Sequence, residues 1–181
     1  MQILLYMVKD TVGLIHLIAS IISLIVGTIV LASVKGTQKH KGYGYVYCVA
    51  MVVTLTTSFL IYRLYNRFGV FHYLALVSGI TLVRGMLPML IHRTNNSLKQ
   101  HFRSMYWSVV GLYAAFAAEL LVRVPFLYKL FSSTILRNIF HYLVVAATIV
   151  VIALSLIVFL KKKPKWLKLA DKFKRYEYKD F

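Results

Sequence analysis

Five long apolar runs constrain this chain more than any other feature of its sequence. They cover about residues 11–34, 43–62, 70–91, 104–124 and 138–160. A helix needs about 20 mostly apolar residues to cross the hydrocarbon core of a bilayer. A membrane β-barrel would instead show many alternating segments of roughly 10 residues. The runs therefore predict an all-α fold, an integral membrane helical bundle of five transmembrane helices within residues 1–160.

The composition excludes an ordinary soluble domain. Hydrophobic residues make up 60% of the 181 residues, against roughly 45–50% in a typical globular protein. The five runs use most of the chain, which leaves no room for a second folded domain. The first partner to expect is the lipid bilayer itself.

The basic residues predict the orientation of the chain in the membrane. The net charge is +17, but the positive residues flank the apolar runs, so we expect no nucleic-acid partner. Fifteen Lys and Arg residues fall on one side, six in the loops and nine after Leu160, against six on the other side. By the positive-inside rule, the N-terminus lies outside and the C-terminus is cytoplasmic.

The last segment, residues 161–181, is a basic tail. Its apolar residues recur at helical spacing and share one face: Trp166, Leu169, Ala170 and Phe173. Lysines occupy the other faces, where they would contact anionic lipid headgroups. Pro164 suits the first turn of such a helix. We expect an interfacial amphipathic helix, with a solvated basic tail as the alternative.

The six histidines fall into two groups near the two ends of the predicted spans. His16, His72 and His141 form an outer group, and His40, His92 and His101 form an inner group. Paired imidazoles from different helices commonly hold an iron porphyrin in a helical bundle. We therefore expect haem b, with His16 and His72 as the outer pair of iron ligands and His40 and His101 as the inner pair.

Two such centres would form a path for electrons across the bilayer. His72 and His92 are 20 residues apart on one predicted span, which is roughly 30 Å and matches the thickness of the hydrocarbon core. The alternative is that histidines at span ends only tolerate the interface, as we expect for His92 and His141. His16 is surrounded by apolar residues, where an unsatisfied polar group is costly, so it should have a partner or a ligand.

Arg84 lies inside the third predicted span, about fourteen residues from its outer end. A charge there is expensive in lipid, so we expect it to face the bundle interior and to bind a haem propionate, a quinone head or a lipid phosphate. Gly85 and Pro88 follow it, and the proline should bend the span.

Other kinds of chemistry have little support in the sequence. Cys48 is the only cysteine, so an internal disulfide is impossible. No hydrolase, nucleotide-binding or nucleophile motif is present, so an enzyme is not favoured. A carrier or metal permease with imidazoles at both gates stays an alternative. It is weakened because proton or cation coupling usually needs acidic residues within the membrane, and Glu119 is the only acid in the predicted spans.

Four short motifs carry a resemblance to a family of proteins. His40, Gly44 and Tyr47 have the spacing H-x3-G-x2-Y, and His101 and Met105 have the spacing H-x3-M. With His16 and the Phe71-His72 pair, they resemble a bacterial family of small multi-span membrane proteins of unknown function. The resemblance covers about Gly13 to Arg123, and the fifth run and the tail lie outside it.

This resemblance implies a multi-pass protein of the bacterial inner membrane and emphasises His16, His40, His72 and His101. A looser likeness, to transmembrane b-type cytochromes, rests on histidine geometry alone. The leading hypothesis is a haem protein for transmembrane electron transfer. The alternative is a non-catalytic accessory subunit that packs against a larger membrane complex with other subunits.

Overall fold

The computed structural model describes residues 10–62, 68–91, 94–123 and 134–177, with the side chains of 70, 122–123, 134–141 and 173–177 excepted. Every regular element in these ranges is a helix, and the five are α2 (Thr11–Ala32), α3 (Gln38–Ser58), α4 (Val70–Ile91), α5 (Asn95–Arg123) and α7 (Thr134–Glu177). The predicted all-α fold is confirmed.

Local signals in the sequence set where the first helices begin. The side chain of Asp10 caps α2 by accepting a hydrogen bond from the Gly13 N–H at 2.7 Å. Thr37 caps α3 in the same way, accepting from the His40 N–H at 3.2 Å. Between them, Gly36 has a φ of 85°, a left-handed conformation that glycine adopts without strain. Gly36 and Thr37 lie in the short turn that leads from α2 back into α3 as a helical hairpin.

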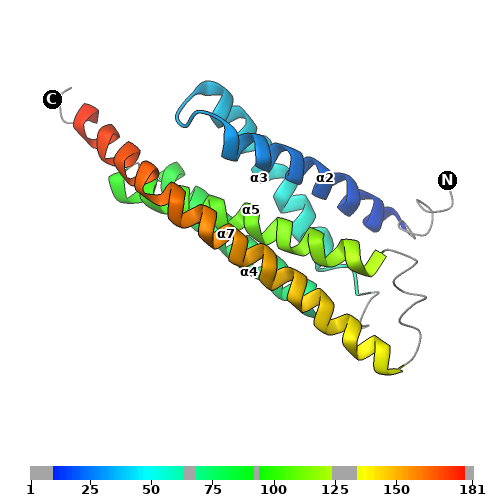
Figure 1. The fold of residues 1–181 in the computed structure, drawn as a ribbon. Helices are drawn as coiled ribbons and strands as arrows, with labels where there is room; N and C mark the ends of the chain where they lie inside the picture. Colours follow the sequence, from blue (N-terminus) through cyan, green and yellow to red (C-terminus); the bar gives the residue numbers. More distant parts are fainter. Residues whose placement is uncertain (1–9, 63–67, 92–93, 124–133, 178–181) are drawn as a thin grey trace.

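Helix α5 lies at the centre of the bundle (Figure 1). It runs beside α4, α7 and α2, while α3 contacts α2 and α4. Helix α2 begins at the end of the bundle opposite to that where α7 ends. The turn between α2 and α3 lies at the same end as the last turns of α7, and we call this the basic end because Lys35, Lys39 and Lys41 lie in or beside that turn.

Four of the described helices are long and apolar enough to cross a membrane: Thr11–Ala32, Phe71–Ile91, Asn95–Leu121 and Tyr142–Lys172. The predicted second run, 43–62, corresponds to α3, which begins earlier and ends at Ser58. Helix α3 does not belong to this set because its first turns carry lysines, histidine and glycines. The chain therefore has several spans, but the structure does not establish five.

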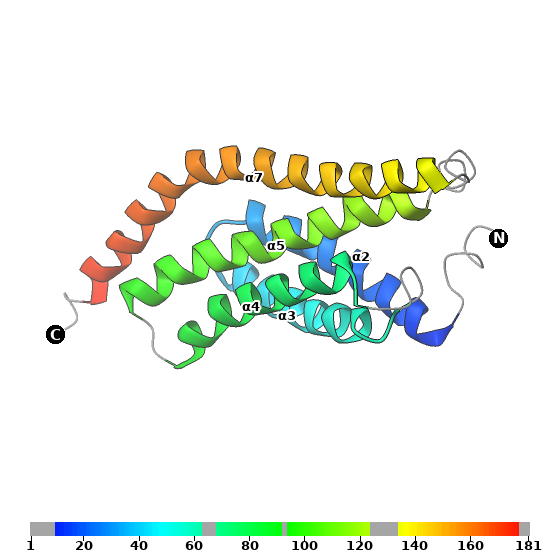
Figure 2. The same cartoon turned by 90° about the horizontal axis from the view of Figure 1, so that it is seen from below.

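The tail differs from the expected separate helix. Residues 161–177 continue α7, and Pro164 lies inside this helix rather than in a first turn. Figure 2 shows α7 bending over its last third, as a proline inside a helix produces. Two residues of the predicted apolar face contact the rest of the bundle: Ala170 is fully buried, and the Trp166 ring lies 5.4 Å from that of Tyr106 on α5.

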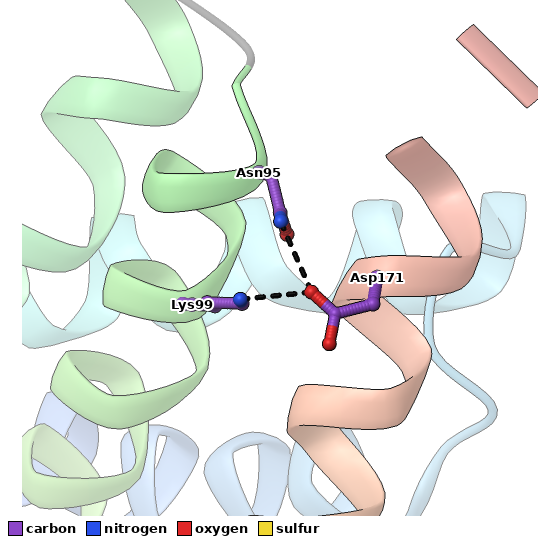
Figure 3. Close-up of polar contacts among 3 residues, drawn as sticks. All are labelled: Asn95, Lys99 and Asp171. Carbon is purple, nitrogen blue, oxygen red and sulfur yellow. Dashed lines mark hydrogen bonds and ion pairs between the residues drawn. The ribbon is translucent and has the colours of Figure 1, made fainter. Parts of the chain in front are cut away.

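Polar contacts hold the end of the tail against the start of α5. The Asp171 carboxylate accepts from the Lys99 ammonium at 2.8 Å and from the Asn95 amide at 3.1 Å (Figure 3). Both interactions lie near the surface, so each contributes little stability by itself. They supplement the packing of Trp166 and Ala170 that holds α7 on α5 at the basic end.

The core joins α2, α3 and α5 through Tyr47. Its side chain is fully buried, and its hydroxyl lies 2.9 Å from that of Ser108. A Cβ at Gly27 would lie 3.0 Å from the Tyr47 ring, so the glycine allows the close approach of α2. The tyrosine of the H-x3-G-x2-Y motif is thus a packing residue.

Candidate functional site

The basic end of the bundle brings His40 and His101 together. His40 lies in the first turn of α3 and His101 in the second turn of α5. Their ring centroids are 6.4 Å apart, and the ring planes meet at 86°. The two residues are 61 positions apart in the sequence, and they are the two that we expected to form the inner pair.

Both imidazoles are held through Nδ1. His101 Nδ1 lies 2.9 Å from the carbonyl oxygen of Gly85, which only accepts, so Nδ1 carries the proton. His40 Nδ1 lies 3.0 Å from the Ser33 hydroxyl, and that hydroxyl already donates to the Val30 carbonyl. Ser33 therefore accepts from His40. In the neutral state, each ring keeps its Nε2 lone pair for another ligand.

A small cavity lies between these rings. Its volume is about 40 Å³, enough for a few water molecules at most. The residues around it come from α2, α3, α4, α5, α7 and the turn after α2, and those used below are Lys35, His40, Gly44, Met86, His101, Met105 and Trp166. The two motifs of the resemblance, H-x3-G and H-x3-M, thus converge on one cavity.

The charge at the cavity is partly compensated. The Lys35 ammonium donates to the carbonyl oxygens of Val30 at 2.7 Å and Leu31 at 3.0 Å, at the C-terminal end of α2. Burial, and then the charge of Lys162, lower the pKa of Lys35 to about 8. Burial, and then the charge of Lys35, lower the pKa of His40 to about 4, so its imidazole is neutral at pH 7.

This site fits a metal ion better than a porphyrin. The donor chemistry suits either one, because both rings are anchored and carry Nε2 lone pairs. The volume of the cavity does not admit a porphyrin, because about 40 Å³ is far below the several hundred Å³ of a pocket for a cofactor-sized ligand. Among the described residues, no group of three or more His, Cys, Asp or Glu side chains gathers at ligand spacing.

At the opposite end of the bundle, His16 binds α3. Its Nδ1 lies 3.1 Å from the Thr54 carbonyl oxygen and 2.9 Å from the Thr57 hydroxyl. The predicted polar partner of this intramembrane histidine is therefore the backbone and side chains of the neighbouring helix. The contacts join α2 to α3 and give His16 a structural role.

His72 has a different environment. Its ring is buried and stacks between Tyr62 and Phe68, with centroids 4.7 Å from each. Its Nδ1 accepts from the Gly69 N–H at 3.1 Å, which leaves the proton on Nε2. That buried atom has no hydrogen-bond partner among the residues that the structure describes. His16 and His72 thus have different neighbours, and their pairing as iron ligands stays a prediction.

Arg84 does not face the bundle interior as we expected. Its side chain is exposed on the outer surface of α4, beside Val83 and Leu87, which are 56% and 49% exposed. The helix rotation that buries Leu82 and Gly85 turns Arg84 outward. His92 lies outside the described residues, as does the side chain of His141.

Sequence reasoning missed several groups at the basic end. Ser33 and the Gly85 carbonyl, which anchor the two imidazoles, carry no sequence signature, because only the fold brings them near histidine. Met86 follows Gly85 directly, and its thioether could have been identified from the sequence as a soft metal ligand beside a glycine inside a predicted span. Trp166 was assigned to the lipid interface, yet it lines the cavity.

A family model described as predicted membrane protein (DUF2306) matches residues 13–160. The match extends through the fifth apolar run, so the expectation that this run lies outside the resemblance was wrong; the tail does lie outside it. No curated protein and no solved structure matches the chain. The looser likeness to b-type cytochromes receives no support from these comparisons.

Proposed function

Because the chain belongs to the DUF2306 family of predicted membrane proteins, we propose that it is a small integral membrane protein that binds a metal at its His40–His101 pair. One observation carries this proposal: two motifs far apart in the sequence place two neutral, anchored imidazoles on one cavity. A neutral imidazole whose Nδ1 is fixed by a hydrogen bond is the usual form of a histidine ligand.

Haem b and transmembrane electron transfer remain the finer version of this proposal. They require that the helices around His40 and His101 separate to admit a porphyrin, because the cavity of about 40 Å³ does not hold one. They also require a second centre, at His16 and His72. The inner pair by itself supports a metal site at one face of the membrane.

The test is the metal content of the full chain purified in mild detergent from metal-replete membranes. We expect about one metal per chain, lost in His40→Ala and in His101→Ala and kept in His16→Ala, the matched control at the opposite end. Absorption spectra before and after reduction with dithionite, with pyridine extraction, distinguish haem iron from a bare ion. Metal content at background level, or equal in all three variants, would overturn the proposal.

A second candidate function is that of an accessory subunit, and the exposure of Arg84 favours it. An arginine on the lipid face near a helix centre costs about 2.5–3.5 kcal/mol on insertion scales. An acidic residue of a partner subunit would remove much of this cost by pairing with the guanidinium. A lipid phosphate is another anion that could pair with Arg84, and a quinone head could accept hydrogen bonds from the guanidinium through its carbonyl oxygens.

Chemical cross-linking in native membranes tests this candidate. We expect a cross-linked partner protein with the wild-type chain and with Arg84→Lys, which keeps the charge, and none with Arg84→Leu. Val83→Leu is the control on the same exposed surface. A partner captured equally well by Arg84→Leu would contradict a role for Arg84 in assembly.

A further inference from the structure

Met86 and Met105 line the same cavity as the two histidines, and the combination of thioether and imidazole side chains favours a particular metal. We infer that His40, His101, Met86 and Met105 form a binding site for a single Cu(I) ion. The inference rests on the proposed function, that the histidine pair binds metal, and it goes further by naming the ion and two additional ligands.

The types of donor exclude the common alternatives. Among the described residues around the cavity there is no Cys, Asp or Glu, so the hard oxygen ligands of Mg²⁺ and Ca²⁺ and the thiolates of structural Zn²⁺ sites are missing. Thioether sulfur is a soft ligand that prefers Cu(I), and imidazole also suits copper. Two imidazoles and two thioethers match a soft, low-coordinate ion.

The donors converge because two of them meet the same residue of α4. His101 and Met105 are one turn apart on α5, and His101 donates to the Gly85 carbonyl oxygen at 2.9 Å. A Cβ at Gly85 would lie 2.7 Å from the Met105 sulfur, so this sulfur occupies the space that a side chain would take. Met86 is the next residue, and His40 approaches from α3.

Charge favours a univalent ion. Lys35 also lines the cavity, and its ammonium adds a positive charge to a site that offers only neutral donors. A divalent ion with no anionic ligand would face a larger cost of burial and repulsion than Cu(I). The two carbonyl oxygens on α2 that accept from Lys35 reduce the repulsion between its ammonium and a bound ion.

Gly44 lines the cavity from α3, together with His40. It lies one turn after His40, and a Cβ at this position would meet nothing within 4 Å. No steric contact within the described chain therefore requires glycine at the centre of the H-x3-G-x2-Y motif. Because Gly44 lines the cavity, we expect a larger side chain here to take up part of its volume without removing any donor.

The experiment is anaerobic titration of the full-length protein in lipid nanodiscs with Cu(I), in competition with the chromophoric chelator bicinchoninate. We expect one Cu(I) per chain, and at least tenfold weaker binding in Met86→Leu and in Met105→Leu. Met89→Leu is the matched control, since Met89 also lies on α4 and is not among the described cavity residues. Gly44→Leu should abolish binding while leaving helix content and elution volume unchanged.

X-ray absorption at the copper edge gives an independent readout. We expect sulfur scatterers together with nitrogen in the wild type, and nitrogen alone in the Met86→Leu/Met105→Leu double variant. If that double variant binds Cu(I) as tightly as the wild type while His40→Ala does not bind, the thioether assignment fails and the metal-binding function stands. If the wild type takes up no Cu(I), no Zn(II) and no haem, both proposals fail.

Discussion

The hydroxyl of Tyr47 on α3 lies 2.9 Å from the hydroxyl of Ser108 on α5, and both side chains are fully buried. This contact is a direct hydrogen bond between the helix that carries His40 and the helix that carries His101. Because His40 is two turns before Tyr47 and His101 two turns before Ser108, the hydrogen bond fixes the relative rotation of the two helices that present the imidazoles.

Replacing Tyr47 by phenylalanine should destabilise the bundle modestly. The variant keeps the ring that packs on Gly27 but removes the hydroxyl that contacts Ser108. Hydrogen bonds between membrane helices contribute about 0.6 kcal/mol on average, so the expected loss of stability is small. Tyr47→Ala should cost about 3–5 kcal/mol, as for other large aromatic side chains in cores. Thermal unfolding in detergent measures both, and equal midpoints for the two variants would contradict the packing role.

Gly85→Ala should disturb the site through Met105. The new Cβ would lie 2.9 Å from the Met105 Cγ and 3.2 Å from its backbone nitrogen, and overpacking of this kind costs about 1–3 kcal/mol. The control is Gly42→Ala on α3, where a Cβ meets nothing within 4 Å and alanine should stabilise the helix by about 0.5–1 kcal/mol. Unfolding midpoints that shift in the same direction in the two variants would show that Gly85 is not tightly packed.

Loss of Trp166 should release the last turns of α7 from α5. The ring packs against Phe102, Tyr106 and Phe159, with centroid distances of 6.4, 5.4 and 5.8 Å. Trypsin cleaves after the neighbouring lysines only when the helix opens locally, so Trp166→Ala should accelerate cleavage of the tail several-fold.

Asp171→Asn should accelerate that cleavage much less. Asp171 forms an ion pair with Lys99, and the two side chains are 58% and 34% exposed, respectively. Such exposed pairs contribute at most about 1 kcal/mol to stability. Leu167→Ala, at a 37% exposed position between these contacts, is the control. Faster cleavage in Asp171→Asn than in Trp166→Ala would mean that the ion pair, and not the aromatic contact, holds the tail.

The distribution of basic residues predicts a cytoplasmic tail and an external start of α2. In a Cys48→Ser background, a membrane-impermeant maleimide added to intact cells should label Asp10→Cys and not Lys163→Cys. Permeabilised cells should show labelling of both variants, because both positions are exposed. The opposite pattern in intact cells would show that fifteen basic residues on one side do not set the orientation.

The apolar runs were sufficient to predict a helical membrane protein and the positions of most of its helices. Apolar runs of about 20 residues specify spanning helices almost without reference to the rest of the fold, because every backbone polar group in lipid must be satisfied within the helix. The run at 70–91 matches α4 residue for residue. The grouping of His40 with His101 followed from depth alone, since both precede a predicted span on the same side.

The contacts that these residues make could not be predicted before the packing of the helices was known. Rotation about each helix axis depends on packing, and it turned Arg84 outward and Met86 toward the cavity. Packing also joined His16 to Thr54 and Thr57 and placed Trp166 on α5 rather than in the lipid interface. Hydropathy cannot foresee these outcomes, because lipid and a helix interior are equally apolar, and only complementary shape and hydrogen bonding distinguish them.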